Sequence, residues 1–195
     1  MKYFNYSLLI ASIALTSACQ SMDSSESDSM SKTNADKPTL EMHAEAKNND
    51  QLFEVHKDGR IYVFYDFEGY QDFLKLGHTP YVLTKIGAGP KGETVVYSLT
   101  SKDKKKASGI ASVDLMEGKL APAEDFYAEM NLEGRTYVFS ELKDMEDVRK
   151  LGEAPYRHAK IGYGSKGESV IFVLNSSNKK QYPSELVAKF DALNK

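Results

Sequence analysis

The 195-residue chain has 25 basic and 28 acidic residues, and its acidic excess lies before residue 51. Residues 51–195 carry 21 residues of each sign, so this part lacks the basic surface on which nucleic-acid binding depends. Cys19 is the only cysteine, which excludes a disulfide within one chain. We therefore expect neither a nucleic-acid partner nor a disulfide framework.

Residues 1–18 have the layout of a secretory signal peptide. Lys2 is their only charged residue, an apolar run extends from Leu8 to Leu15, and small residues precede Cys19. The run is shorter than the roughly 20 residues that a membrane-spanning helix needs. A cleaved signal is therefore expected, not a membrane span or a buried helix.

The segment Ser17-Ala18-Cys19 resembles the lipobox of bacterial lipoprotein precursors, although Thr16 stands where leucine is usual. The resemblance covers about the first 20 residues. It implies diacylglycerol on the Cys19 sulfur, cleavage before Cys19 and acylation of the new amino group, for example with palmitate. Two or more acyl chains anchor a protein stably, whereas one does so only marginally. Gln20 in the next position implies an outer-membrane lipoprotein, on the periplasmic face or at the cell surface.

Residues 19–50 are expected to form a lipidated, disordered tether. Ser, Asp, Glu, Asn and Lys dominate this stretch, which has no aromatic residue and no apolar periodicity. Such a composition buries too little apolar surface to offset the conformational entropy lost on ordering.

The remainder contains an internal repeat. Residues 54–106 align without a gap with 129–181, at an offset of 75, and 24 of these 53 pairs are identical. We interpret this as a tandem duplication, with repeats at 51–118 and 119–195. Two copies are too few for a stacked array, so a pseudo-twofold pair is the simpler arrangement.

Each copy is predicted to be a ββαββ unit, and at least the second has a trailing helix at 184–193. In the first copy, Gly59 is expected in a hairpin turn, Asp66 as a helix N-cap, and Gly77 at the helix end. The fold class is therefore α+β with an antiparallel sheet. The expected elements of the first copy are strands at 52–56 and 60–65, a helix at 66–76, a strand ending at 86 and a strand at 94–99.

Two loops, beginning at Gly87 and Gly162, match the G-x-G-x-x-G spacing of dinucleotide-binding sites. Such a site needs the loop to open a helix, whereas strands are expected after both loops. Neither loop has the Lys-Ser/Thr pair of a phosphate-binding P-loop. We expect hairpin turns, no nucleotide, and no cofactor besides the lipid on Cys19.

The histidines do not indicate a metal or catalytic site. His43 lies in the expected tether, and none of the other three recurs at the offset of 75. They share no metal-ligand spacing, so no metal is expected. No nucleophile motif is present, and no catalytic residue is predicted.

Four charged pairs survive in both copies without an obvious packing reason. They have a structural explanation, as ion pairs across a turn or between strands, and a functional one, as equivalent ligand contacts in the two halves. The candidate binding residues are Arg60, Arg135, Lys85, Lys160, Lys91, Lys166, Glu93 and Glu168.

Two functions remain open. The favoured hypothesis is a lipid-anchored envelope protein that serves as a non-catalytic binding or structural module for an envelope protein or a cell-wall partner. The alternative is a small periplasmic hydrolase with a dispersed active site, for which His78 or His158 should lie beside a carboxylate and a serine in a deep cleft.

Overall fold

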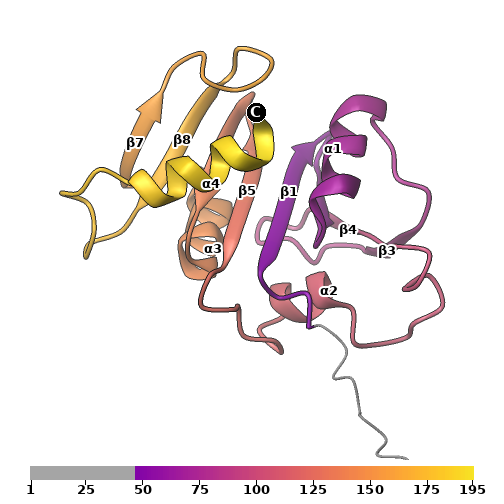
Figure 1. The fold of residues 1–195 in the computed structure, drawn as a ribbon. Helices are drawn as coiled ribbons and strands as arrows, with labels where there is room; N and C mark the ends of the chain where they lie inside the picture. Colours follow the sequence, from indigo (N-terminus) through magenta and orange to yellow (C-terminus); the bar gives the residue numbers. More distant parts are fainter. Residues whose placement is uncertain (1–46) are drawn as a thin grey trace, which may run out of the picture. The chain divides into compact units, whose positions relative to one another are not determined.

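The computed structural model describes residues 47–195. The predicted signal peptide, Cys19 and most of the expected tether lie outside these residues. Within them the chain forms one eight-stranded sheet and four helices, a mixed α+β fold (Figure 1). None of these helices is long and apolar enough to cross a membrane.

The element order ββαββα occurs twice along the described chain. The predicted elements are found to within two residues at each end, and a short helix follows the fourth strand of the first half. The elements are β1 (Gln51–Lys57), β2 (Arg60–Phe64), α1 (Phe67–Leu76), β3 (Val82–Lys85), β4 (Thr94–Ser98), α2 (Ala111–Met116), β5 (Tyr127–Leu132), β6 (Arg135–Phe139), α3 (Leu142–Leu151), β7 (Tyr156–Lys160), β8 (Ser169–Leu174) and α4 (Ser184–Asn194).

The predicted turn and caps are confirmed. Asp58 and Gly59 have φ angles of 52° and 71° between β1 and β2, in the left-handed region that such a tight hairpin needs. The Asp66 side chain accepts a hydrogen bond from Gly69 N at 2.7 Å, which satisfies a free amide in the first turn of α1. Gly77 ends this helix at a φ of 78°.

The prediction of an antiparallel sheet is correct for only part of the structure. The strand order is β3-β4-β2-β1-β5-β6-β8-β7, and four of the seven neighbouring pairs are antiparallel. The pairs β1·β5, β2·β4 and β6·β8 are parallel. The central strands β1 and β5 are largely buried on both faces, which suits parallel pairing as well as antiparallel pairing.

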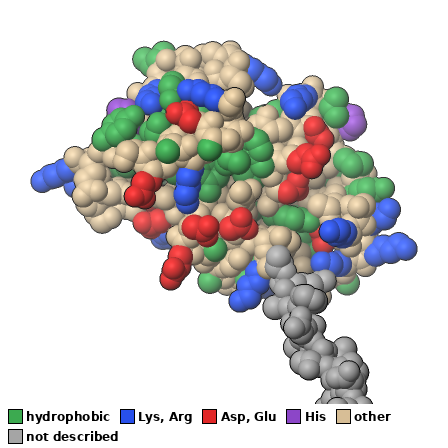
Figure 2. Space-filling model, in the orientation of Figure 1, with side chains coloured by type: hydrophobic (Ala, Val, Ile, Leu, Met, Phe, Trp, Pro, Cys, Tyr) green, Lys and Arg blue, Asp and Glu red, His purple; other side chains and the backbone are tan. Residues whose placement is uncertain are grey.

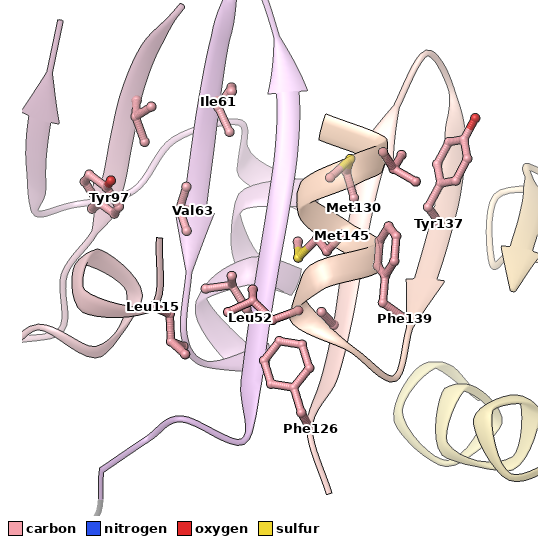
Figure 3. Close-up of a cluster of buried hydrophobic side chains, with 14 of the residues drawn as sticks. Leu52, Ile61, Val63, Tyr97, Leu115, Phe126, Met130, Tyr137, Phe139 and Met145 are labelled. Atoms are coloured by element: carbon pink, nitrogen blue, oxygen red, sulfur yellow. The ribbon is translucent and has the colours of Figure 1, made fainter. Parts of the chain in front are cut away.

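The two faces of the sheet carry different helices and separate cores. The first core cluster lies under α2 and α3, and Figure 3 shows Met145 of α3 facing residues of the strands. The second core cluster lies under α1 and α4. The largest members of the first are Leu52, Ile61, Tyr97, Leu115, Phe126, Met130, Tyr137, Phe139 and Met145; those of the second are Phe53, Phe64, Tyr70, Phe73, Tyr127, Phe172 and Phe190.

Residues related by the offset of 75 have similar burial in some cases and different burial in others. Phe64 and Phe139 are both fully buried, whereas Tyr137 is buried and Tyr62 is only half-buried. Leu151, the last residue of α3, is 68% exposed, whereas Leu142, Met145 and Val148 of the same helix are buried.

Candidate functional site

The eight sequence-predicted residues all lie at one end of the sheet, where β1, β3, β5 and β7 end. The register places Arg60 beside Thr94 and Lys85 beside Val95, and it places Arg135 and Lys160 beside the start of β8 in the same way. The other four lie in the loops that join β3 to β4 and β7 to β8. They do not form one cluster, because the corresponding members lie on opposite faces of the sheet.

Lys85 and Lys160 illustrate this separation. Lys85 pairs with Glu117, beyond α2, on the face of the first core cluster, so the expected pairing across the sheet is wrong for this residue. Lys160 lies on the other face, with its ammonium 4.0 Å from the centre of the Tyr163 ring. Arg60 and Arg135 are both exposed, and no ion pair is recorded for either within residues 47–195.

The two glycine-rich loops are turns closed by their glutamates. Glu93 accepts a hydrogen bond from the backbone N–H of Lys91 at 2.8 Å, and Glu168 accepts one from that of Lys166 at 2.9 Å. The expected ion pair across each turn is therefore replaced by a side-chain-to-backbone bond. A strand follows each loop, so neither loop has the helix N-terminus that a dinucleotide site needs.

The loop lysines connect the two halves. Lys166 donates to the backbone carbonyl of Leu74 in the last turn of α1, at 3.1 Å. Lys91 Nζ lies 4.0 Å from where a Cβ on Gly152, the C-cap of α3, would be. A positive charge near a helix C-terminus is favourable, which gives each lysine a structural role.

Within residues 47–195, neither His78 nor His158 has a recorded hydrogen bond to a carboxylate or a serine. His78 is exposed, and His158 packs edge-on against Tyr182 with ring centres 4.9 Å apart. His56 lies 3.1 Å from the buried Glu54 carboxylate. Among the described residues, no group of three or more His, Cys, Asp or Glu side chains is placed to hold a metal ion.

A cavity of about 270 Å³ on the α1–α4 face contains a buried carboxyl group that the sequence analysis missed. Glu129 of β5 is only 1% exposed and lines this cavity. We call it the Glu129 cavity. Its other lining residues include Tyr70, Gln71, Leu74 and Lys75 of α1, Asn131, Thr136, Ser165, Lys166 and Glu168, and Phe190 and Asn194 of α4.

Neutral groups satisfy the Glu129 carboxyl. The Tyr127 hydroxyl donates to Oε1 at 2.5 Å, and the Asn194 amide donates to the same oxygen at 2.7 Å. No ion pair of Glu129 is recorded among residues 47–195. Burial raises the pKa of Glu129, and this outweighs the lowering by hydrogen bonds from Tyr127, Asn194 and Tyr70.

Glu54, 75 positions earlier, has the opposite environment on the other face of the sheet. It is fully buried and pairs with Arg149 of α3, whose Nε lies 2.9 Å from Oε1 and 3.1 Å from Oε2. Burial raises the pKa of Glu54, but the charge of Arg149 and hydrogen bonds from His56 and Arg149 bring it below its ordinary value. The corresponding helix position in the first half is Leu74, which lines the Glu129 cavity.

Comparisons of the chain with protein-family models, with curated proteins and with solved structures gave no match. The surface gives little further indication, because acidic and basic side chains are interspersed on the face drawn in Figure 2. The candidate site is the Glu129 cavity, because a buried carboxyl group lines it. The sequence signal for it was a glutamate that recurs within a strand at the offset of 75.

Proposed function

We propose that this chain is a lipid-anchored envelope protein of the outer membrane and acts as a non-catalytic binding module whose ligand enters the Glu129 cavity. The expected signal peptide and the lipobox ending at Cys19 support the anchor. The observation that carries the binding role is Glu129, a buried carboxyl that faces a cavity without a basic partner. Burying a carboxylate is costly unless it is paired, so such a group is kept more readily at a site of interaction.

The scaffold of this module is a tandem duplication with a pseudo-twofold axis between β1 and β5, parallel to the strands. The identical residues, the repeated element order and the mirrored strand order support this proposal. An axis in the sheet plane also exchanges the two faces, which accounts for α1 and α3 lying on opposite sides. Ile86 and Ile161 are aligned at the offset of 75, and they are 89% and 91% exposed. Core packing therefore does not explain why both positions are isoleucine.

The duplication makes Glu54 an internal reference for Glu129. One copy neutralises its buried glutamate with an arginine, whereas the other has leucine at that position and an open cavity. This divergence favours a function at the Glu129 side of the sheet.

A small periplasmic hydrolase receives less support. Ser165 lines the cavity, but no hydrogen bond between Ser165 and Glu129 is recorded within residues 47–195. A serine nucleophile needs a base within hydrogen-bond reach.

Photo-crosslinking in intact cells tests the binding role. A benzophenone amino acid in place of Lys75 would lie at the Glu129 cavity, and one in place of Lys150 would lie at the corresponding exposed position of the other half. We expect a discrete adduct from position 75 that is lost in Glu129→Gln and is absent from position 150. Equal adducts from both positions, or no adduct from position 75, would contradict the proposal.

The anchor is tested separately with Cys19→Ala. This variant should lose labelling by a fatty-acid analogue and should leave the membrane fraction after carbonate washing. Retention of the label would contradict lipidation at Cys19.

A further inference from the structure

We infer that the Glu129 cavity binds an alkylguanidinium group, such as an arginine side chain. This inference rests on the proposed function, which makes the cavity a ligand site, and it specifies the chemistry of the ligand. The argument begins with the place where the protein itself fills the corresponding position.

Arg149 provides that internal example. Its guanidinium reaches Glu54 from α3, with Nε 2.9 Å from Oε1 and Nη2 also bonded to that oxygen. Both side chains are almost completely buried, at 6% and 0% exposure. A planar guanidinium suits a carboxylate because its N–H groups form a fixed fork, and Arg149 uses two of them on one carboxyl group.

In the other half the same carboxylate is present and the arginine is not. Leu74 occupies the α1 position that aligns with Arg149, and both Leu74 and Glu129 line the cavity. Leucine has no group that can pair with a carboxylate. The space beside Leu74 is about 270 Å³, several times the roughly 30 Å³ of one water molecule, which gives room for a guanidinium and part of its alkyl chain.

The basic residues of the cavity do not pair with the Glu129 carboxyl, whose hydrogen-bond partners are the neutral side chains of Tyr127, Asn194 and Tyr70. The ammonium of Lys166 is directed to the carbonyl of Leu74, and no ion pair between Glu129 and Lys75 or Lys166 is recorded in the described part of the chain. The cavity wall is also partly apolar, through Leu74 and Phe190, which suits the methylene groups of an arginine side chain. Glu129 therefore supplies a buried carboxyl group for a cationic head, and Glu168 places a second carboxyl group on the cavity wall.

The test is an NMR titration of the full-length protein in detergent micelles with butylguanidine, an analogue of the arginine side chain. Ligand concentrations should reach about 10 mM, because a ligand of this size binds with roughly millimolar affinity. We expect saturable shifts for cavity residues. N-butylurea has the same shape without the charge and should not bind. Butylamine should bind about tenfold more weakly, since it cannot form the forked pair.

Variants decide whether the binding occurs at the inferred place. Glu129→Gln should weaken the affinity for butylguanidine by about tenfold or more. Leu74→Arg should fill the cavity from within, as Arg149 does in the other half, and should abolish binding. Leu74→Met, which keeps an apolar side chain of similar size, should retain it. Binding that survives Leu74→Arg or Glu129→Gln would overturn the inference, as would a wild-type protein that does not bind.

The source of the guanidinium is resolved by two further ligands. A blocked peptide with one arginine should bind at least as well as free L-arginine if the group belongs to a protein partner, and free L-arginine should bind better if the ligand is a small molecule. Absence of binding by both would contradict the inference. A positive cross-link from position 75 together with no guanidinium binding would refute the ligand chemistry while leaving the binding module intact.

Discussion

The opposite environments of Glu54 and Glu129 predict opposite effects of the same substitution. Glu54→Gln leaves Arg149 buried without a full counter-charge. Removing one partner of a buried ion pair costs about 3–5 kcal/mol. For a domain of about 150 residues, each kcal/mol lowers the melting temperature by about 2–4 °C, so we expect a fall of roughly 10 °C at neutral pH.

Glu129→Gln should instead stabilise the protein at neutral pH. Burial raises the pKa of Glu129, so the folded state favours the protonated form. Its contribution to stability is complete below the pKa of the unfolded chain and is lost as the pH rises through the folded pKa. A glutamine mimics the protonated carboxyl and therefore avoids this loss of stability at neutral pH. Each unit by which the folded pKa exceeds the unfolded pKa corresponds to about 1.4 kcal/mol.

The pH dependence separates the two cases. The pKa of Glu54 is lowered, so its contribution is present above the pKa of the unfolded chain and is lost as the pH falls through the folded pKa. The advantage of Glu129→Gln should therefore shrink as the pH falls toward the ordinary pKa of glutamate, whereas the defect of Glu54→Gln should shrink only at pH values below it. The groups around Glu129 are Tyr70, Tyr127 and Asn194, with Lys75, Lys166 and Glu168 on the cavity wall.

Thermal unfolding of the full-length protein and both variants, followed by circular dichroism from about pH 2 to pH 8, measures these effects. The reasoning is refuted if Glu129→Gln destabilises the protein at pH 8 as much as Glu54→Gln does.

Three further predictions follow from the scaffold. Gly164→Ala should lower the melting temperature, because the added Cβ would overlap the Glu168 carboxylate that closes the turn, whereas Ser165→Ala should leave it nearly unchanged. In calorimetry, residues 51–195 of the full-length protein should unfold in one transition, because β1 and β5 join both halves into one sheet; two separate transitions would show that the halves are independent. ATP, GTP and NAD should not raise the melting temperature, since strands follow the glycine-rich loops, and a saturable rise would contradict the turn interpretation.

Local structure was predictable from the sequence because its signals lie within a few residues of each element. The Asp66 cap, the Gly59 turn and the Gly77 helix end each depend on neighbouring residues, and each was confirmed. The strand order was not predictable, because the sequence of a buried strand such as β1 does not specify which strand lies beside it or in which direction. The parallel contact of β1 with β5 joins segments that are 76 residues apart.

The site was harder to predict for the same reason. Glu54 and Glu129 are identical residues at the start of the repeat, and both lie in largely buried strands. Their difference depends on Arg149 and Leu74, which lie far away in the chain and approach the glutamates only because α1 and α3 lie on opposite faces of the sheet. The exposed charges that the sequence analysis selected proved to be turn, helix-end and surface residues, while the buried pair carries the asymmetry.

Carboxyl-carbon NMR of Glu54 and Glu129 in the full-length protein, titrated with and without butylguanidine, tests the central claim most directly. We predict that Glu129 titrates above the ordinary range of glutamate and Glu54 below it. Butylguanidine should lower the pKa of Glu129 and leave that of Glu54 unchanged, because only Glu129 has an open cavity for a cation. Two glutamates that titrate alike, or an equal response of both to the ligand, would contradict the account.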